Sequence, residues 1–325
     1  MLAAWYDRPG RAAEVLRVGE MLDPEPGPGE VRVRLTRSGI NPGDTKKRGD
    51  WVGSGLPYPR VIPHSDGAGV VDAVGEDVSS GLVGDRVWVY GAQSYRPFGT
   101  AAQFTVVPVT QAVTLPDEVS DDVGACLGIP GITAHRAVFS DGPVAGTTVL
   151  VHGVLGAVGS AAAQLAAWNG ATVIGTVRSG SDIEHIDGTV THRIALDDPG
   201  AASAIRRVAP DGVHRIVEVS FSDNADLDAV VAAPEAVIAA YATRDPRPDF
   251  DFWPMLFANL TIRLLGSDDF PATAKQQAAA DLTTAARDGA LHIPIAEPLP
   301  LDRIAEAHDR VDAGTRARVV LSIPL

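Results

Sequence analysis

Cysteine is almost absent from this sequence, since Cys126 is the only one among 325 residues. A single thiol forms no intrachain disulfide and cannot supply a cysteine-rich zinc site. Positive charge is also scarce, because 27 lysines and arginines stand against 41 acidic residues and the net charge is −14. This acidic excess argues against nucleic acid and anionic membrane surfaces as partners.

Long hydrophobic runs are missing as well. No apolar stretch reaches the roughly 18 residues that a membrane-spanning helix needs, and the first residues show no signal-peptide pattern. The hydrophobic content of 45% and the charged content of 21% are typical of a globular protein. We therefore expect a cytoplasmic protein with no membrane partner, and its length allows about two domains.

The first 120 residues are rich in glycine, proline and β-branched residues. Apolar and polar residues alternate over 30–36, 67–75 and 84–90, which predicts half-buried strands separated by glycine-containing turns. Many short strands of this kind are typical of a small β-barrel-like domain.

From about residue 121 the pattern changes to helices that alternate with short apolar strands. Such alternation predicts βαβ units and a parallel sheet, and therefore an α/β fold class. Helices are then expected over 272–289 and 301–312, and a last strand over 318–323. The strands expected in the sheet are 149–152, 172–176, 215–219, 236–241 and 261–265.

The stretch 147–168 joins a buried strand, a glycine-rich turn and a helix of small residues. Gly153, Gly156 and Gly159 follow one another at three-residue spacing. In a dinucleotide-binding turn, such glycines let the backbone approach a pyrophosphate and let the helix pack close to the strand. The N–H groups at the start of the helix, at Ala157 and Val158, would then face the phosphates.

The residues after the second expected strand of the sheet favour NADP(H) as the cofactor. Sites selective for NAD usually place an acidic residue there, about 20 residues past the glycine turn, whereas this chain has Arg178 and Ser179. A guanidinium and a hydroxyl suit a 2′-phosphate. His192 and Arg193 follow the next short segment and could close the same pocket. The alternative is that Arg178 is only a solvated cation in a loop.

Several stretches taken together resemble the zinc-independent branch of the medium-chain dehydrogenase/reductase superfamily, and most closely its quinone oxidoreductase and zeta-crystallin family. The resemblance implies a GroES-like catalytic domain formed by residues 1–120 and 267–325. It also implies a Rossmann doubly wound parallel sheet, the NADP-binding domain, formed by residues 121–266. The matching stretches are 38–44, 65–71, 83–87, 128–134, 148–159 and 304–308.

The resemblance further implies that no catalytic zinc is bound. The positions at which zinc-dependent relatives carry a cysteine, a His-Glu pair and a second cysteine hold Asn41, Ser65–Asp66 and Ile129 here. A catalytic zinc needs three protein ligands and an open position, which these residues do not supply. A rearranged site would have to use His64 and Cys126, and we expect His64 to be a loop residue and Cys126 a buried apolar one.

Without a metal to polarise a carbonyl, the acceptor must itself be electron-poor, as a quinone or an α,β-unsaturated ketone is. By resemblance, Asn41 is expected to hydrogen-bond the substrate or the nicotinamide ribose, and Thr133 to lie on the nicotinamide side of the site. The residues alone, without the resemblance, allow a simpler alternative. Asn41 would then be a turn-forming residue before a proline, and Thr133 would be a residue on a helix surface.

Two aromatic residues and one arginine complete the candidate site. Trp51 stands where relatives often carry a tyrosine that is a proposed proton donor; because an indole is no practical acid, Trp51 is expected to form a flat wall of the substrate pocket or to belong to the core. Tyr58 is the candidate that could replace the missing donor. Arg318, just before the last strand, is a candidate contact for a cofactor phosphate or the substrate.

These observations predict an NADPH-dependent, zinc-independent reductase of quinones or activated alkenes. One alternative is an enoyl-thioester or pathway-specific enone reductase, and another is an NADPH-binding sensor or structural protein with little turnover. Relatives commonly form homodimers or homotetramers through the edge of the nucleotide-domain sheet, for which 261–265 is the candidate strand. The aromatic residues between 250 and 257 are expected in a helical core, or else in a wall of the substrate cleft.

Overall fold

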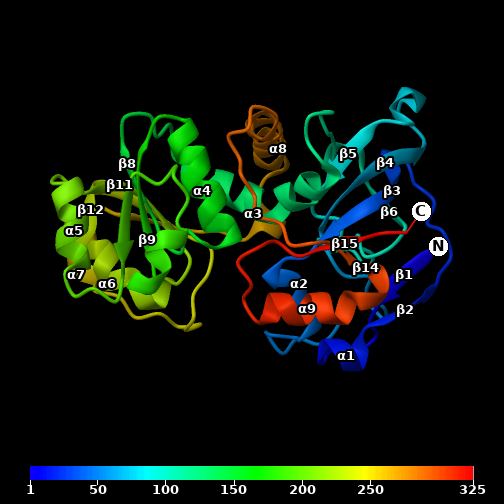
Figure 1. Ribbon diagram of the computed structural model, residues 1–325, viewed down its shortest axis with the longest axis horizontal. Coiled ribbons are helices and arrows are strands. Elements are labelled where there is room, and N and C mark those ends of the chain that lie inside the picture. Colours follow the sequence, from blue (N-terminus) through cyan, green and yellow to red (C-terminus); the bar gives the residue numbers. More distant parts are fainter. Residues whose placement is uncertain (325) are drawn as a thin grey trace. The chain divides into compact units, whose positions relative to one another are not determined.

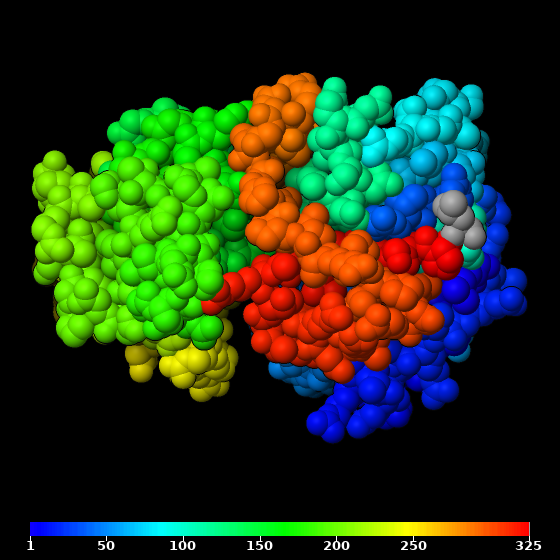
Figure 2. All heavy atoms as spheres, in the orientation of Figure 1, coloured from blue at the N-terminus to red at the C-terminus, as the bar shows by residue number. Residues whose placement is uncertain are grey.

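The computed structural model describes residues 1–324, which form two compact units. Unit 1 comprises residues 1–130, 275–287 and the chain from 293 onward; unit 2 comprises residues 131–274 and 288–292. The chain therefore leaves unit 1 and returns to it. Figures 1 and 2 show the orange and red C-terminal segments beside the blue N-terminal ones within this unit.

Unit 1 is built around a seven-stranded, mostly antiparallel sheet with the order β14-β15-β3-β4-β5-β7, in which β6 also pairs with β3. β3 (Glu30–Gly39) shows why the alternating pattern forms a strand here, since Val31, Val33 and Leu35 are fully buried while the residues between them are not. β15 (Val320–Ser322) pairs antiparallel with the end of β3, so the C-terminal segment completes the sheet. The other strands are β4 (Asp66–Val74), β5 (Arg86–Val89), β6 (Phe104–Pro108), β7 (Ala112–Thr114) and β14 (Leu299–Pro300), with β1 (Leu2–Trp5) and β2 (Arg17–Glu20) as a separate pair.

The helices of unit 1 lie around this sheet (Figure 1). α2 (Pro42–Arg48) begins directly after β3, with Asn41 as its N-cap and a proline in its first turn. α3 (Asp121–Phe139) is kinked at Gly128 and continues into unit 2, and α8 (Ala272–Arg287) also crosses the division. The remaining helices are α1 (Ala12–Val15), α9 (Ile304–Asp312) and the short 3-10 turns η1 (Ser80–Leu82), η2 (Val109–Gln111) and η5 (Leu301–Arg303).

Unit 2 contains a six-stranded sheet with the order β10-β9-β8-β11-β12-β13, and every strand pair in it is parallel. This is the doubly wound order of a Rossmann fold, so the expected fold class is confirmed. The strands are β8 (Thr148–Val151), β9 (Thr172–Val177), β10 (His192–Ala195), β11 (Val213–Glu218), β12 (Ala232–Ala240) and β13 (Thr261–Leu264). The helices are α4 (Ala157–Trp168), α5 (Ala201–Val208), α6 (Phe221–Val231) and α7 (Phe252–Phe257), with 3-10 turns η3 (Gly180–His185) and η4 (Ser267–Asp269).

The aromatic residues near α7 do not form the expected core. Phe252, Trp253 and Phe257 are 55%, 62% and 77% exposed, and only Met255 of this helix is buried. The core interpretation of these residues was wrong because only the face of α7 that carries Met255 packs against the core of unit 2. No helix among residues 1–324 is both long and apolar enough to span a membrane.

Candidate active site

The glycine turn of unit 2 has the backbone that a phosphate-binding turn requires. Gly153 has a φ of +64°, and a Cβ on Gly159 would lie 2.4 Å from the Gly153 carbonyl oxygen, so only glycine fits at these two positions. The first hydrogen bond of α4 in this turn runs from the Ser160 N–H to the Gly156 oxygen. The N–H groups of residues 157–159 precede it and point out of the helix end, where a pyrophosphate would be held.

Arg178 and Ser179 follow the carboxyl end of β9, on the same edge of the sheet as this turn. The Arg178 side chain is exposed, and within residues 1–324 it makes neither an ion pair nor a hydrogen bond. A residue just after β10 holds this loop in place. The Asp197 carboxylate accepts hydrogen bonds from the Gly180 N–H at 3.0 and 3.2 Å. The sequence did not reveal Asp197, since it reaches this loop only through the parallel pairing of β10 with β9.

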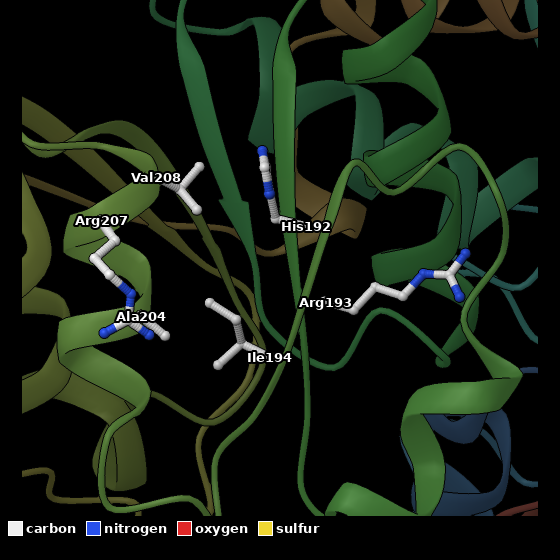
Figure 3. A pocket seen from close by; sticks show the side chains of 6 residues that line it. All are labelled: His192, Arg193, Ile194, Ala204, Arg207 and Val208. Atoms are coloured by element: carbon white, nitrogen blue, oxygen red, sulfur yellow. The ribbon is translucent and has the colours of Figure 1, made fainter.

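Arg193 lies in the middle of β10. One of its guanidinium nitrogens donates to the Asp187 carbonyl at 3.3 Å. In Figure 3 the Arg193 side chain extends to the right, away from Ile194 and from Arg207 of α5. A cavity of about 470 Å³ lies at this strand and at α5. Its lining residues are His192, Arg193, Ile194, Ala204, Arg207 and Val208.

A cluster of buried polar side chains includes His152, the residue that precedes the glycine turn. The Nε2 of His152, the residue before Gly153, is 2.9 Å from Asp228 Oδ1 and 3.6 Å from Glu218 Oε2, and its Nδ1 is 2.8 Å from the Thr176 hydroxyl. All these side chains are buried. Burial raises the pKa of Glu218 to about 7, and the carboxylates of Asp228 and Glu218 outweigh the effect of burial to raise the pKa of His152.

In unit 1, Asn41 is buried and its amide is held on both sides. A guanidinium nitrogen of Arg318 donates to Asn41 Oδ1 at 2.7 Å, and Asn41 Nδ2 donates to Asp66 Oδ2 at 2.7 Å. The backbone N–H of Asn41 donates to the Asp44 carboxylate at 2.8 Å, which fixes the start of α2. The Nε of Arg318 is buried as well and has no hydrogen-bond partner within residues 1–324.

Asp66, the first residue of β4, is fully buried beside the kink of α3. Its two carboxylate oxygens accept from the Ile129 N–H at 3.0 and 2.9 Å. A Cβ on Gly128 would lie 2.1 Å from Asp66 Oδ1, so the glycine and its non-helical ψ of −108° permit this approach. Burial raises the pKa of Asp66 to about 7, against the opposing hydrogen bond from Asn41. From the sequence, Asp66 stands out only as a position where zinc-dependent relatives carry a zinc ligand.

A chain of hydrogen bonds through two histidines ends on the backbone carbonyl of Asp66. Because a guanidinium can only donate, every following group accepts on one side and donates on the other, so both imidazoles are neutral. Burial lowers the pKa of both rings. The links are Arg48 Nη1 to His308 Nδ1 (3.2 Å), His308 Nε2 to His64 Nε2 (2.8 Å), His64 Nδ1 to Ser38 Oγ (2.8 Å), Ser38 Oγ to Thr100 Oγ1 (2.8 Å), and Thr100 Oγ1 to Asp66 O (2.7 Å).

This geometry bears on the candidate zinc ligands. Both ring nitrogens of His64 are used in the chain, and burial raises the pKa of the Cys126 thiol. Among residues 1–324, the group of three side chains spaced to hold a metal ion is the His152 cluster in unit 2, and not positions 41, 65 and 129.

The remaining candidates lie apart from this network. Trp51 is 67% exposed, with Lys46 Nζ 5.7 Å from its ring centroid, so it is not a core residue. The Tyr58 hydroxyl donates to the Tyr95 carbonyl. Tyr58 lines a cavity of about 460 Å³ whose lining does not include Trp51. Thr133 is buried in the part of α3 that belongs to unit 2.

The comparisons with known proteins agree with this architecture. Residues 27–117 match the alcohol dehydrogenase GroES-like domain. A GroES-like domain joined to a Rossmann sheet defines a medium-chain dehydrogenase/reductase.

Relatives of known sequence and structure narrow this class. Human quinone oxidoreductase is 30% identical over 312 residues, which cover 94% of this chain and 92% of the relative. A mycobacterial protein solved in complex with NADPH is 26% identical, with a TM-score of 0.83 and 99% of each chain covered. A Pseudomonas syringae quinone oxidoreductase is 25% identical, with a TM-score of 0.84 over 99% of each chain. The chain belongs to the quinone oxidoreductase family.

Proposed function

We propose that this chain is an NADPH-dependent, zinc-independent reductase of quinones or activated alkenes. The observation that carries the proposal is the glycine turn, whose backbone leaves no room for a Cβ at Gly159 and opens the amides of residues 157–159 to a pyrophosphate. The family relation to human quinone oxidoreductase supports the acceptor class.

The residues of unit 2 fit this cofactor. Gly153, Gly156 and the amides of residues 157–159 would hold the pyrophosphate. Arg178 and Ser179, exposed and half-buried at the end of β9, would hold the 2′-phosphate, with Arg193 on the neighbouring strand. NADPH, when bound, supplies the hydride. Thr133 would lie beside the nicotinamide.

The residues of unit 1 would serve the acceptor. Asn41 would donate a hydrogen bond to the acceptor oxygen on which negative charge develops. Trp51 and Tyr58 are the candidate aromatic contacts. Arg318 is only 7% exposed and is bonded to Asn41, so it would serve the acceptor through Asn41. Because Asn41 and Asp66 hold each other, neither is presented as a metal ligand.

The test of the proposal is oxidation of NADPH, followed by absorbance, with a benzoquinone, a naphthoquinone, a simple enone and an enoyl thioester. Turnover with the quinones or the enone supports it. Turnover with the thioester alone would favour the enoyl reductase, and tight NADPH binding without turnover would favour the sensor. A zinc chelator should leave the rate unchanged; a rate that falls with chelation contradicts zinc independence.

Gly159→Ala tests the cofactor site directly. The added Cβ would lie 2.4 Å from a backbone oxygen, so NADPH binding, measured by fluorescence titration, should be lost. Gly188→Ala is the matched control, since a Cβ there has no atom within 4 Å. Unchanged NADPH affinity in a folded Gly159→Ala variant would remove the cofactor from this turn.

We further propose a homodimer or homotetramer formed through β13. This edge strand pairs only with β12 within residues 1–324, and Leu264 at its end is 77% exposed. The exposed aromatic residues of α7 precede it in the chain, and such a combination of open strand edge and apolar side chains is suited to association. Light scattering after size exclusion should give at least twice the 33.9 kDa chain mass; a monomer at micromolar concentration contradicts this.

A further inference from the structure

Two neighbours of Asn41 fix which end of its amide points where. An arginine only donates, and Asp66 only accepts once it is ionised, which at its raised pKa means above about pH 7. The atom facing Arg318 is therefore Oδ1, and the atom facing Asp66 is Nδ2. A half-turn of the amide would place two donors opposite each other at Arg318 and two acceptors opposite each other at Asp66. The orientation of the Asn41 side chain is thus determined by charge as well as by packing.

Asp66 is itself held on every side. Its carboxylate accepts from the Ile129 N–H, its carbonyl accepts from the Thr100 hydroxyl, and Gly128 leaves room for both oxygens. The side chain is 0% exposed, so it cannot touch a substrate. A residue that is rigid, charged and out of reach of the substrate can act on the reaction only through what it binds.

We propose that Asp66 is a positioning residue which, together with Arg318, orients the Asn41 amide so that its second Nδ2 hydrogen is offered to the acceptor oxygen. This rests on the function proposed above, in which Asn41 touches the acceptor. One of the two hydrogens on Nδ2 is used by Asp66. The other is therefore directed by the Asp66 contact, and a donor that is already oriented needs no reorganisation during the reaction.

Asp66→Asn is the first variant to measure. The new amide has the same size but no negative charge. In one orientation its NH2 group faces the Asn41 Nδ2 donor, and in the other it faces the Ile129 N–H, so in neither orientation does Asn41 keep the ionised acceptor that holds it. We expect kcat with a naphthoquinone to fall roughly 10- to 100-fold. The Kd for NADPH should stay within about twofold, because Asp66 lies in unit 1 and the glycine turn lies in unit 2.

A double-mutant cycle separates positioning from a structural role. Asn41→Ala should slow kcat, and Asn41→Ala combined with Asp66→Asn should be no slower than Asn41→Ala alone, because Asp66 acts through Asn41. Multiplying effects in the double variant would overturn the proposal. Full kcat in Asn41→Ala would instead refute the role of Asn41 in the proposed function, which is a distinguishable result.

Arg318 provides a second pair of variants if Asp66→Asn does not fold. Arg318→Lys keeps a cationic donor near Asn41 Oδ1 and should retain more kcat than Arg318→Met, and this difference should vanish in the Asn41→Ala background. Equal kcat for the two Arg318 variants would overturn the proposal. Thr105→Val is the control, since Thr105 is 1% exposed and its hydroxyl has no partner within residues 1–324.

Discussion

Each unit of this protein buries a polar cluster, and the two clusters differ in what sets the direction of their hydrogen bonds. In unit 1 the chains of hydrogen bonds begin at Arg318 and Arg48. Both side chains can only donate, so the donor and acceptor roles of the groups that follow are fixed. In unit 2 the cluster of His152, Glu218 and Asp228 contains two carboxylates and one imidazole and no arginine or lysine.

The difference shows how a buried charge can be balanced in two ways. A guanidinium stays charged at any pH a protein meets, so Arg318 holds Asn41 Oδ1 at every pH, whereas Asp66, whose pKa burial raises to about 7, is largely ionised only above that pH. A proton on an imidazole or a carboxyl group is bound or released as the pH changes, so the stability of the unit 2 cluster depends on pH. The contrast predicts that unit 1 variants affect turnover most, whereas unit 2 cluster variants affect stability most.

The largest stability effect is expected from Asp228→Ala. It leaves the buried His152 without its closest carboxylate, and breaking a buried pair costs about 3–5 kcal/mol. Urea unfolding measures this loss. Asp223→Ala, which removes the exposed pair with Arg244, should change the free energy of unfolding far less. Equal losses in the two variants would show that the buried cluster contributes no more than a surface pair.

The pH dependence of stability should be the next largest effect. The folded-state pKa of Glu218 is raised from 4.5 to about 7, so the folded chain binds this proton more tightly than the unfolded chain does. The free energy of unfolding therefore falls as the pH rises from about 4.5 to 7. The raised pKa values of His152 and Asp66 act in the same direction.

Thermal melts at pH 6 and pH 8 measure this dependence. We expect a higher melting temperature at pH 6, and a smaller difference in Glu218→Gln, which has no carboxyl group to titrate. Asp223→Asn is the control, because the Arg244 and Ser220 hydrogen bonds lower the pKa of Asp223 to about 2 and it does not titrate in this window. An unchanged pH difference in Glu218→Gln would contradict the assignment.

The smallest expected effect comes from Arg178, which is exposed in unit 2, whereas Arg318 of unit 1 is buried. Arg178→Ala should weaken NADPH binding by about 1.5–3 kcal/mol, the value of a hydrogen bond to a charged group, and leave NADH binding nearly unchanged. Arg207→Ala, on the α5 side of the cavity in Figure 3, is the control and should change neither. Equal loss of both cofactors in Arg178→Ala would remove it from the 2′-phosphate site.

The local pattern of the chain was sufficient to predict most of the fold. The expected strands 149–152, 172–176 and 261–265 correspond within one residue at each end to β8, β9 and β13, because short runs rich in β-branched and apolar residues between turn residues favour strands. β10 was not predicted, since its four residues include His192 and Arg193 and show no apolar run. β12 starts at Ala232, four residues before the expected strand.

The candidate site residues also divide into those that the sequence could suggest and those that it could not. The glycine turn and the candidate Arg178 could be proposed from sequence, because a turn and the residues that follow a strand are local features. The contacts of Asn41 could not, because Asp66 lies 25 residues and Arg318 lies 277 residues away along the chain. The exposure of Trp51 and of α7 was likewise decided by the surroundings of each segment and not by its composition.

The sequence by itself determined that this is a two-part α/β chain with a dinucleotide turn, because glycine spacing and hydrophobic period act over a few residues. Only the tertiary structure decided which buried groups meet. The pairing of β15 with β3 brings the C-terminal segment to Asn41, and the kink at Gly128 offers the Ile129 N–H to Asp66. Hydrogen bonds between residues far apart in the chain depend on where the backbone places them, and residue type alone does not specify that.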